Sequence, residues 1–288
     1  MLKKMLFMTL FFARLNAQEV LDGDRDSVNY SLADAPDKGE PGKVYHMNYK
    51  VDVPIIVVGG AATIYSFTII YTKKNTPVAT IQALNKNDIP AFDRWATRYH
   101  DLNMDKISYY PFYGVMPLPL ILLADKKMRK DAGSIGLLYL EAFAFTGVIY
   151  ASSVYFVDRY RPDVYNTTLD MSYRTNGNFR NSFFAGHVAV MATSTFFIAR
   201  VFDDYHPESN WKWAIYGGAA AATAGMGYMR LEAGKHFPSD ILLGAAVGVA
   251  SGLFTPALHK NRNLSKQRWS LSPFIMDRGQ GFSFTYKL

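Results

Sequence analysis

The chain has 288 residues, of which 49% are hydrophobic and 15% aromatic, and a formal net charge of +7. This is ample material for one helical domain of ordinary or large size. The absence of cysteine excludes a disulfide framework and thiolate metal sites, but it leaves the cellular compartment open. The positive charge suits anionic partners. Because the basic residues gather at segment ends and form no stripe, no nucleic-acid partner is expected.

The N-terminal residues predict a signal peptide. Lys3 and Lys4 precede a short apolar run, and Ala17 supplies a small residue at its end. The run is too short to span a bilayer. Residues 1–17 are therefore expected to be a secretory signal peptide, with an uncleaved amphipathic N-terminus as the alternative. Residues 18–52 are polar and rich in Asp, Gly and Pro, and are expected to form an irregular exported segment.

Six apolar segments follow, each near the length that crosses about 30 Å of hydrocarbon. They are residues 54–72, 109–124, 134–157, 183–201, 213–229 and 238–258. Small residues crowd the later segments, which suits close packing of membrane helices. The prediction is an all-α bundle of about six helices, transmembrane, forming a domain over residues 53–260. A soluble bundle with alanine-rich core helices is the alternative, because the mean hydropathy is close to neutral.

Two other regions carry a recognisable pattern. Residues 85–106 place Phe92, Trp95 and Tyr99 at helical spacing among charges, which predicts an amphipathic helix at the membrane interface. The tail, residues 261–288, becomes strand-like near its end. There Phe282, Phe284 and Tyr286 alternate after a glycine-rich turn, which predicts a short C-terminal β-hairpin.

The chemistry centres on Arg230, His236 and Asp240. Pro238 fits the first turn of a helix, so His236 lies just before that helix and Asp240 lies inside its first turn. A carboxylate at this spacing can accept a hydrogen bond from Nδ1 of the imidazole. The tautomer would then be fixed with a free lone pair on Nε2, as a nucleophile or base requires. Arg230 would supply fixed positive charge nearby.

A second cluster lies upstream. Arg161 precedes a proline, and Ala185, Gly186 and His187 open an apolar helix. The free N–H groups and the dipole at a helix N-terminus bind phosphate-like anions.

In this order the two clusters resemble the type 2 phosphatidic acid phosphatase family, which shares its site with bacterial acid phosphatases and vanadium haloperoxidases. The family pattern is Lys-x6-Arg-Pro, then Pro-Ser-Gly-His, then Ser-Arg-x5-His-x3-Asp. The third block is present apart from Met229 in place of its serine. The second keeps Gly186 and His187, but Ala185 replaces its serine. The first keeps Arg161, but Val154 stands where the family has lysine.

The resemblance implies phosphoester hydrolysis through a phosphohistidine, with no metal or other cofactor. His236 would be the nucleophile, oriented by Asp240, and His187 the acid and base. Phosphate oxygens would be held by Arg161, Arg230 and the N–H groups at Ala185 and Gly186. Lys235, or alternatively Arg159, Arg174 or Arg180, would compensate for the lysine missing at Val154.

The substrate expected from the apolar helices is an anionic phospholipid or another lipid phosphate. Phosphatidic acid, phosphatidylglycerol phosphate, undecaprenyl pyrophosphate and lipid A phosphates all fit. Two alternatives remain: a soluble periplasmic acid phosphatase, or a degenerate phospholipid-binding membrane protein, which the changes at Val154 and Ala185 motivate. The sequence leaves the oligomeric state open.

Loop charges predict the orientation in a bacterial inner membrane. Lys126–Lys130 and residues 260–268 are the strongest basic clusters, so both are expected in the cytoplasm. Counting across residues 134–157 then puts the active site in the periplasm. Counting six spans from an exported N-terminus instead puts it in the cytoplasm. Either the proline-broken second segment fails to cross, or the first residues stay in the membrane.

Glu141 lies within an apolar segment, where a carboxylate is either functional or a hydrogen-bonded interhelical residue. The histidines His46, His100, His206 and His259 belong to no cluster and are expected at the surface. No His, Asp and Glu set shows metal-ligand spacing along the chain.

Overall fold

The computed structural model describes residues 43–261, 269–276 and 279–286. The expected signal peptide and most of the expected exported segment lie outside these residues. The chain divides into two compact units, residues 45–260 and a second unit that joins residues 1–44 to residues 261–288. In the second unit, strands β1 (Trp269–Met276) and β2 (Gly279–Tyr286) pair antiparallel, with Trp269 opposite Tyr286.

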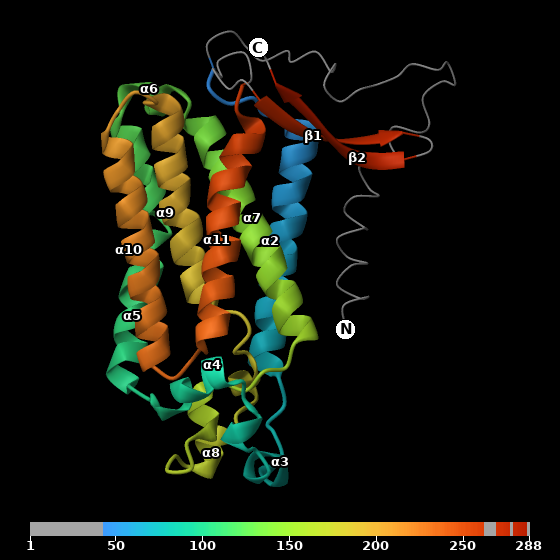
Figure 1. The fold of residues 1–288 in the computed structure, drawn as a ribbon, viewed down its shortest axis with the longest axis vertical. Helices are drawn as coiled ribbons and strands as arrows, with labels where there is room; N and C mark the ends of the chain where they lie inside the picture. The colour runs from blue at the N-terminus through green and yellow to red at the C-terminus, as the bar shows by residue number, and fades with distance from the viewer. Residues whose placement is uncertain (1–42, 262–268, 277–278, 287–288) are drawn as a thin grey trace. The chain divides into compact units, whose positions relative to one another are not determined.

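The unit 45–260 is a bundle of long helices, which confirms the predicted all-α class (Figure 1). Its six longest helices correspond to the six apolar segments. They are α2 (Tyr49–Thr72), α5 (Leu102–Val115), α7 (Ala132–Phe156), α9 (Gly186–Tyr205), α10 (Trp211–Glu232) and α11 (Pro238–His259).

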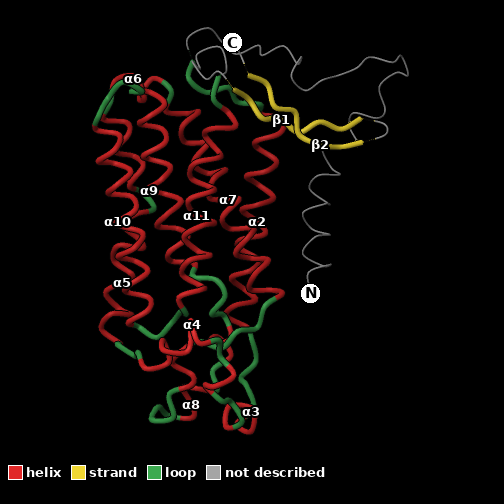
Figure 2. The backbone as a smooth tube through the Cα atoms, in the orientation of Figure 1, coloured by secondary structure: helices red, strands yellow, loops and turns green. Residues whose placement is uncertain are grey.

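Short helices cap the two ends of this bundle (Figure 2). One end carries α6 (Lys126–Lys130) and is called the α6 end. The opposite end, called the site end, carries α3 (Val78–Gln82), α4 (Ala91–Arg94) and α8 (Met171–Arg174). Residues 43–261 also contain five 3-10 helices: η1 (Lys86–Asp88), η2 (Trp95–Arg98), η3 (Leu118–Ala124), η4 (Pro162–Tyr165) and η5 (Gly177–Arg180). The single interfacial helix predicted for residues 85–106 is wrong, because this stretch forms η1, α4, η2 and the start of α5.

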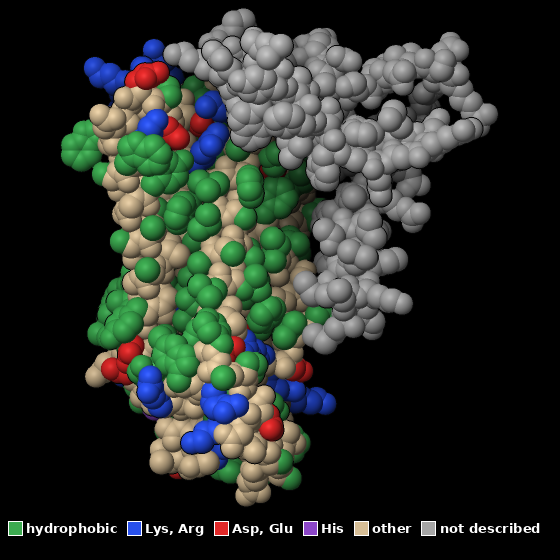
Figure 3. Space-filling view, in the orientation of Figure 1, with side chains coloured by type: hydrophobic (Ala, Val, Ile, Leu, Met, Phe, Trp, Pro, Cys, Tyr) green, Lys and Arg blue, Asp and Glu red, His purple; other side chains and the backbone are tan. Residues whose placement is uncertain are grey.

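Four helices of the described residues are long and apolar enough to cross a membrane: α2, residues 102–124 with α5 and η3, α7, and α11. The other two long helices, α9 and α10, do not meet that measure. In α9, Arg200, Asp203 and Asp204 fall in the last two turns. On the face shown in Figure 3, hydrophobic side chains cover the middle of the bundle and charged side chains gather at its two ends. These features indicate a membrane protein.

Close packing of α11 on α9 brings the two histidine-bearing regions together. A Cβ at Gly244, Gly248 or Gly252 of α11 would lie within 3.0 Å of an α9 backbone atom or the helix-capping carbonyl. Only glycine allows this approach, which is the usual way in which membrane helices pack without large side chains between them.

The course of the helices decides one question that the sequence left open. The proline-containing segment 102–124 runs from the site end to the α6 end, so its prolines do not stop it from extending along the bundle (Figure 1). The entry to α2 lies at the α6 end, where the His46 N–H donates to the carbonyl of His259 and Tyr45 donates to Asp204. An exported segment before α2 and a cytoplasmic α6 therefore cannot both be right.

Candidate active site

His236 lies in the loop between α10 and α11, and the backbone of this loop is fixed. Gly234 adopts a φ of 67°, in the left-handed region where glycine is favoured, and a Cβ there would collide with the carbonyl of Tyr99. The Lys235 N–H returns to the carbonyl of Arg230 at 3.1 Å. This turn ends α10 and aims the buried imidazole of His236 inward.

The orientation of His236 comes from a backbone group. Its Nδ1 lies 2.7 Å from the carbonyl oxygen of Ser182, so Nδ1–H donates and Nε2 keeps its lone pair. The predicted contact with Asp240 is wrong, although the tautomer it was meant to fix is the one found. Burial and the positive charges of Arg230 and Arg161 lower the pKa of His236 well below its usual range, against the raising effect of the Ser182 carbonyl. The imidazole is therefore neutral at pH 7.

Asp240 acts on His236 through Ser182. Its carboxylate accepts hydrogen bonds from the Ser182 hydroxyl at 2.6 Å and from the Phe237 N–H at 2.9 Å, and it pairs with Arg159. Arg159 also binds Asp93 at 2.7 Å, so its guanidinium is committed to two carboxylates. Arg159 therefore holds the carboxylate that fixes Ser182. A role for Arg159 as a substitute phosphate ligand does not fit this arrangement.

His187 lies in the first turn of α9, beside an open helix N-terminus. Ala185 is the residue before the helix and offers no side-chain cap, while its own N–H donates to the Asp240 carbonyl at 3.1 Å. The first N–H groups of α9 have no intrahelical partner. Gly186 is required here, because a Cβ would meet the ring of Tyr150 at 2.9 Å.

The His187 ring is held by aromatic side chains of α5. Its centroid lies 4.2 Å from that of Phe112 and 5.0 Å from that of Tyr109. Its Nε2 is buried and has no hydrogen-bond partner among residues 43–261. One ring nitrogen of this side chain is thus available to a ligand.

Two arginines complete the cluster. Arg230 donates from one terminal nitrogen to Asp105 and to Ser108, both at 2.8 Å, and Arg161 packs on the ring of Phe179. The Nε of each is buried without a partner in the described part of the chain. Both guanidinium groups contribute positive potential at His236 and at His187. Four of the predicted site residues therefore meet at the site end.

Lys235 is buried but engaged elsewhere. Its ammonium lies 3.0 Å from Asp163 and 2.7 Å from the Tyr173 hydroxyl. Burial alone would raise the pKa of Asp163, but His100, Lys235 and Tyr173 hold it below its usual range. Lys235 therefore neutralises Asp163. This geometry does not favour a contact between Lys235 and phosphate. His100, expected at the surface, instead lies against this carboxylate at 3.8 Å.

Of the other proposed substitutes for the missing lysine, Arg174 donates to the Val164 carbonyl at 2.8 Å. Arg180 donates from a terminal nitrogen to the Lys74 carbonyl at 3.0 Å, but its Nε is buried without a partner among the described residues. Val154 itself is buried in α7, and its carbonyl accepts from the ammonium of Lys73 at 3.2 Å.

Sequence reasoning missed the supporting residues of the site. The sequence patterns did not single out Ser182, and Asp105 and Ser108 lie in another segment, about 120 residues from Arg230. One local signal was available. Asp105 and Ser108 are three residues apart at the start of an apolar helix, so both lie on one face and can share a buried cation.

Comparison with known proteins adds the family. Residues 135–264 match the family model described as PAP2 superfamily. The matched segment is therefore similar to this superfamily. The matched segment runs from α7 through α11 and contains all of the predicted site residues.

One solved structure and one negative result complete the comparison. A transmembrane PAP2-type phosphatidylglycerolphosphate phosphatase from Bacillus subtilis aligns with 76% of this chain and 99% of its own, at 18% sequence identity and a TM-score of 0.43. No curated protein matches this chain.

Proposed function

We propose that this protein hydrolyses a phosphomonoester or pyrophosphate of a lipid through a phosphohistidine on His236. The observation that carries the proposal is the group of buried nitrogen atoms without partners: Nε of Arg161, Nε of Arg230 and Nε2 of His187. Buried polar groups are normally satisfied, so together these atoms suit a bound anion. Next to them, the neutral imidazole of His236 has its Nε2 lone pair free.

The first chemical step is attack by Nε2 of His236 on phosphorus. The bond from phosphorus to the lipid oxygen breaks, and that oxygen takes a proton from His187. Arg161, Arg230 and the first N–H groups of α9 hold the other phosphate oxygens as charge develops. In the second step His187 takes a proton from water, the water oxygen attacks phosphorus, and the nitrogen–phosphorus bond breaks to release phosphate.

The surroundings of His187 favour a lipid over a soluble ester. Tyr109 contacts the His187 ring and stacks on Tyr113, with ring centroids 5.9 Å apart. Tyr113 is 62% exposed and Tyr110 is 78% exposed, both on a helix that belongs to an apolar segment of spanning length. Aromatic side chains at this position would guide acyl chains while the phosphate reaches the arginines.

One observation favours the alternative of a degenerate, non-catalytic phospholipid-binding protein. The family lysine is absent at Val154, and three of the four cations suggested from the sequence, Lys235, Arg159 and Arg174, are engaged by other groups. A lipid-binding protein would retain the arginines and lose turnover.

A phosphate-release assay on purified protein tests the proposal. The substrates are phosphatidic acid, phosphatidylglycerol phosphate, undecaprenyl pyrophosphate and a lipid A phosphate, with p-nitrophenyl phosphate as the soluble comparison. We expect turnover of at least one lipid and little turnover of the soluble ester. Tight lipid binding without phosphate release would support the non-catalytic alternative, and preference for the soluble ester would favour a periplasmic acid phosphatase.

The proposed location is a bacterial inner membrane with the site end in the periplasm, as the charges of Lys126–Lys130 favour. Cysteines introduced singly at His46, Lys127 and Asn176, all exposed in a chain without native cysteine, test it. A membrane-impermeant maleimide added to intact cells should label position 176 alone. The reverse pattern would invert the orientation, and opposite results at 46 and 127 would contradict the arrangement of α2.

A further inference from the structure

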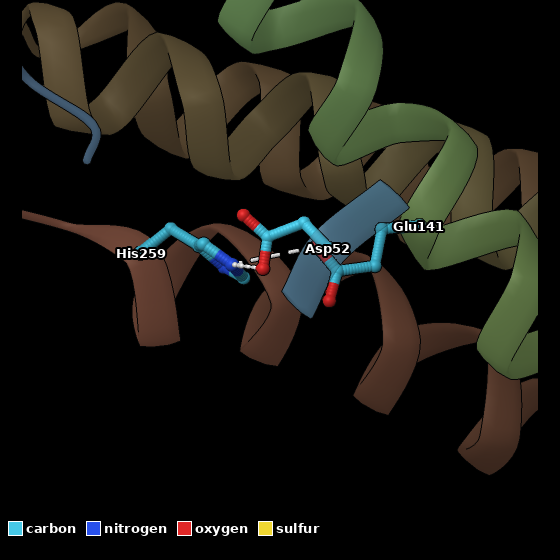
Figure 4. Close-up of side chains that lie close together, drawn as sticks. All are labelled: Asp52, Glu141 and His259. Atoms are coloured by element: carbon cyan, nitrogen blue, oxygen red, sulfur yellow. Dashed lines mark ion pairs between the residues drawn. The ribbon is translucent and has the colours of Figure 1, made fainter. Parts of the chain in front are cut away.

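Three side chains that can bind a metal ion meet inside the bundle, away from the proposed active site. Asp52 comes from the first turn of α2, Glu141 from α7 and His259 from the last turn of α11 (Figure 4). Asp52 and Glu141 are buried, and the side chain of His259 is 14% exposed. One ligand atom from each residue lies within 4.8 Å of the other two.

Backbone groups orient two of the three side chains. Nδ1 of His259 lies 2.9 Å from the Thr255 carbonyl, so Nδ1–H donates and Nε2 faces the carboxylates. One oxygen of Asp52 accepts the Asn48 N–H at 2.7 Å, while its other oxygen faces Nε2. A histidine whose second nitrogen donates to a carbonyl is the usual arrangement of a metal-binding imidazole.

The two distances from His259 to the carboxylates fit a shared cation better than hydrogen bonds. Nε2 of His259 lies 3.3 Å from Oδ1 of Asp52 and 3.4 Å from Oε2 of Glu141. A charge-assisted N–H to carboxylate bond is shorter, about 2.7–2.9 Å. Ligands bound tetrahedrally at about 2.0–2.2 Å are separated by roughly 3.4 Å. Moreover, Oε2 of Glu141 has no hydrogen-bond partner among the residues described.

The charge of the cluster also favours a bound cation. Asp52 and Glu141 bring two carboxylates into the interior, and within residues 43–261 His259 is the only basic residue that pairs with either. Burying uncompensated carboxylates is costly. A divalent cation would neutralise both while leaving the imidazole uncharged.

We propose that Asp52, Glu141 and His259 bind one divalent transition-metal ion, with Zn²⁺ as the first candidate, and that this ion ties α2 to α7 and α11. An imidazole with two carboxylates suits Zn²⁺, and three protein ligands leave a fourth position for water. The site is separate from the phosphate chemistry and does not rest on it. The expectation that His259 is an unclustered surface residue is wrong. Glu141 lies between helices, and its Oε2 is available to bind a metal ion.

Metal analysis of the full-length protein tests this site. The protein is purified in detergent with its affinity tag removed, incubated with Zn²⁺ and desalted before elemental analysis. We expect about one Zn²⁺ per wild-type chain. The near-isosteric variants Asp52→Asn and Glu141→Gln should lose most of it. Added Zn²⁺ should raise the Tm of the wild type by several degrees and leave the Tm of these variants unchanged.

Two matched variants separate this site from the other histidines. His206 makes a similar pair with a single carboxylate, 3.2 Å from Asp125, so His206→Gln should keep the metal. His236→Ala should also keep it, which excludes binding between the active-site histidines. Co²⁺ substituted into the wild type should show the absorption of a tetrahedral site, a readout independent of how the variants fold. Sub-stoichiometric metal with no change in Tm would overturn the proposal, as would Zn²⁺ lost only from His236→Ala.

Discussion

The two ends of the bundle each contain an inward-facing histidine held in the same way and surrounded by opposite charge. At the site end, Nδ1–H of His236 donates to the Ser182 carbonyl, and at the α6 end, Nδ1–H of His259 donates to the Thr255 carbonyl. Both leave the Nε2 lone pair facing the interior. The backbone therefore sets the tautomer in both places and does not distinguish their chemistry.

The neighbours of the two imidazoles make the difference. Arg161 and Arg230 contribute positive potential at His236, which suits an anionic substrate. Asp52 and Glu141 face His259, which suits a cation. A histidine of fixed tautomer is thus a nucleophile or a metal ligand according to the charges around it.

The largest expected effect separates the two histidines directly. His236→Ala removes the proposed nucleophile and should lower the rate of phosphate release by at least about 10³-fold, because no other group can form the covalent intermediate. His259→Ala should leave that rate within about threefold, since it acts far from the site. Both rates are measured on protein whose Tm shows that it is folded. A His236→Ala enzyme within tenfold of wild type would reject the nucleophile assignment.

Arg161 provides a cleaner probe of the positive cluster than Arg230. Its side chain packs on Phe179 and its Nε has no partner in the described residues, so Arg161→Ala should cost little stability. Removing one donor to the developing charge should lower kcat/KM by about 10²-fold. Arg161→Lys keeps the charge without the planar fork and should fall between the two. Equal activity of all three proteins would show that Arg161 does not touch the phosphate.

Arg159 tests whether the site end is organised through Asp240. In Arg159→Gln the buried carboxylates of Asp93 and Asp240 lose their common partner, so Tm should fall. The Ser182 carbonyl that orients His236 would be held less firmly, and we expect kcat to drop about 10-fold with little change in KM. A rise in KM at constant kcat would instead identify Arg159 as a direct phosphate ligand. If Arg159 acts by holding Asp240, Arg159→Lys should restore part of kcat.

The smallest expected effect concerns pH. Because burial and the two arginines lower the pKa of His236, the acid limb of kcat/KM should lie below about pH 6.5. A lowered pKa also means that the unfolded chain binds the proton more tightly. The stability that His236 contributes is therefore present above the unfolded pKa near 6.5 and is lost as the pH falls below it. The drop in Tm from about pH 7.5 to about pH 5.5 should be smaller in His236→Ala. An acid limb above about pH 7 would contradict a neutral imidazole.

Much of the site end was predictable from local patterns. Pro238 with Asp240 predicts the start of α11, and the glycine turn predicts the N-terminus of α9, because capping depends on residues within one turn. The spacing of Arg161, His187, Arg230 and His236 predicted membership of a family. The sequence could not predict that His236 donates to the Ser182 carbonyl, because these residues lie 54 positions apart and meet only when α9 packs on α11.

By itself the sequence determined the helical class, the six long segments, and the histidines and arginines of the candidate site, because periodicity, capping and motif spacing are local properties of the chain. Only the tertiary structure decided which partners those residues have. In the structure Asp240 binds Ser182 and Arg159, and Lys235 pairs with Asp163. Asp52 lies beside His259, although the two are some 200 residues apart in sequence. Such pairings depend on how helices distant in sequence pack, and the same helix patterns allow many packings.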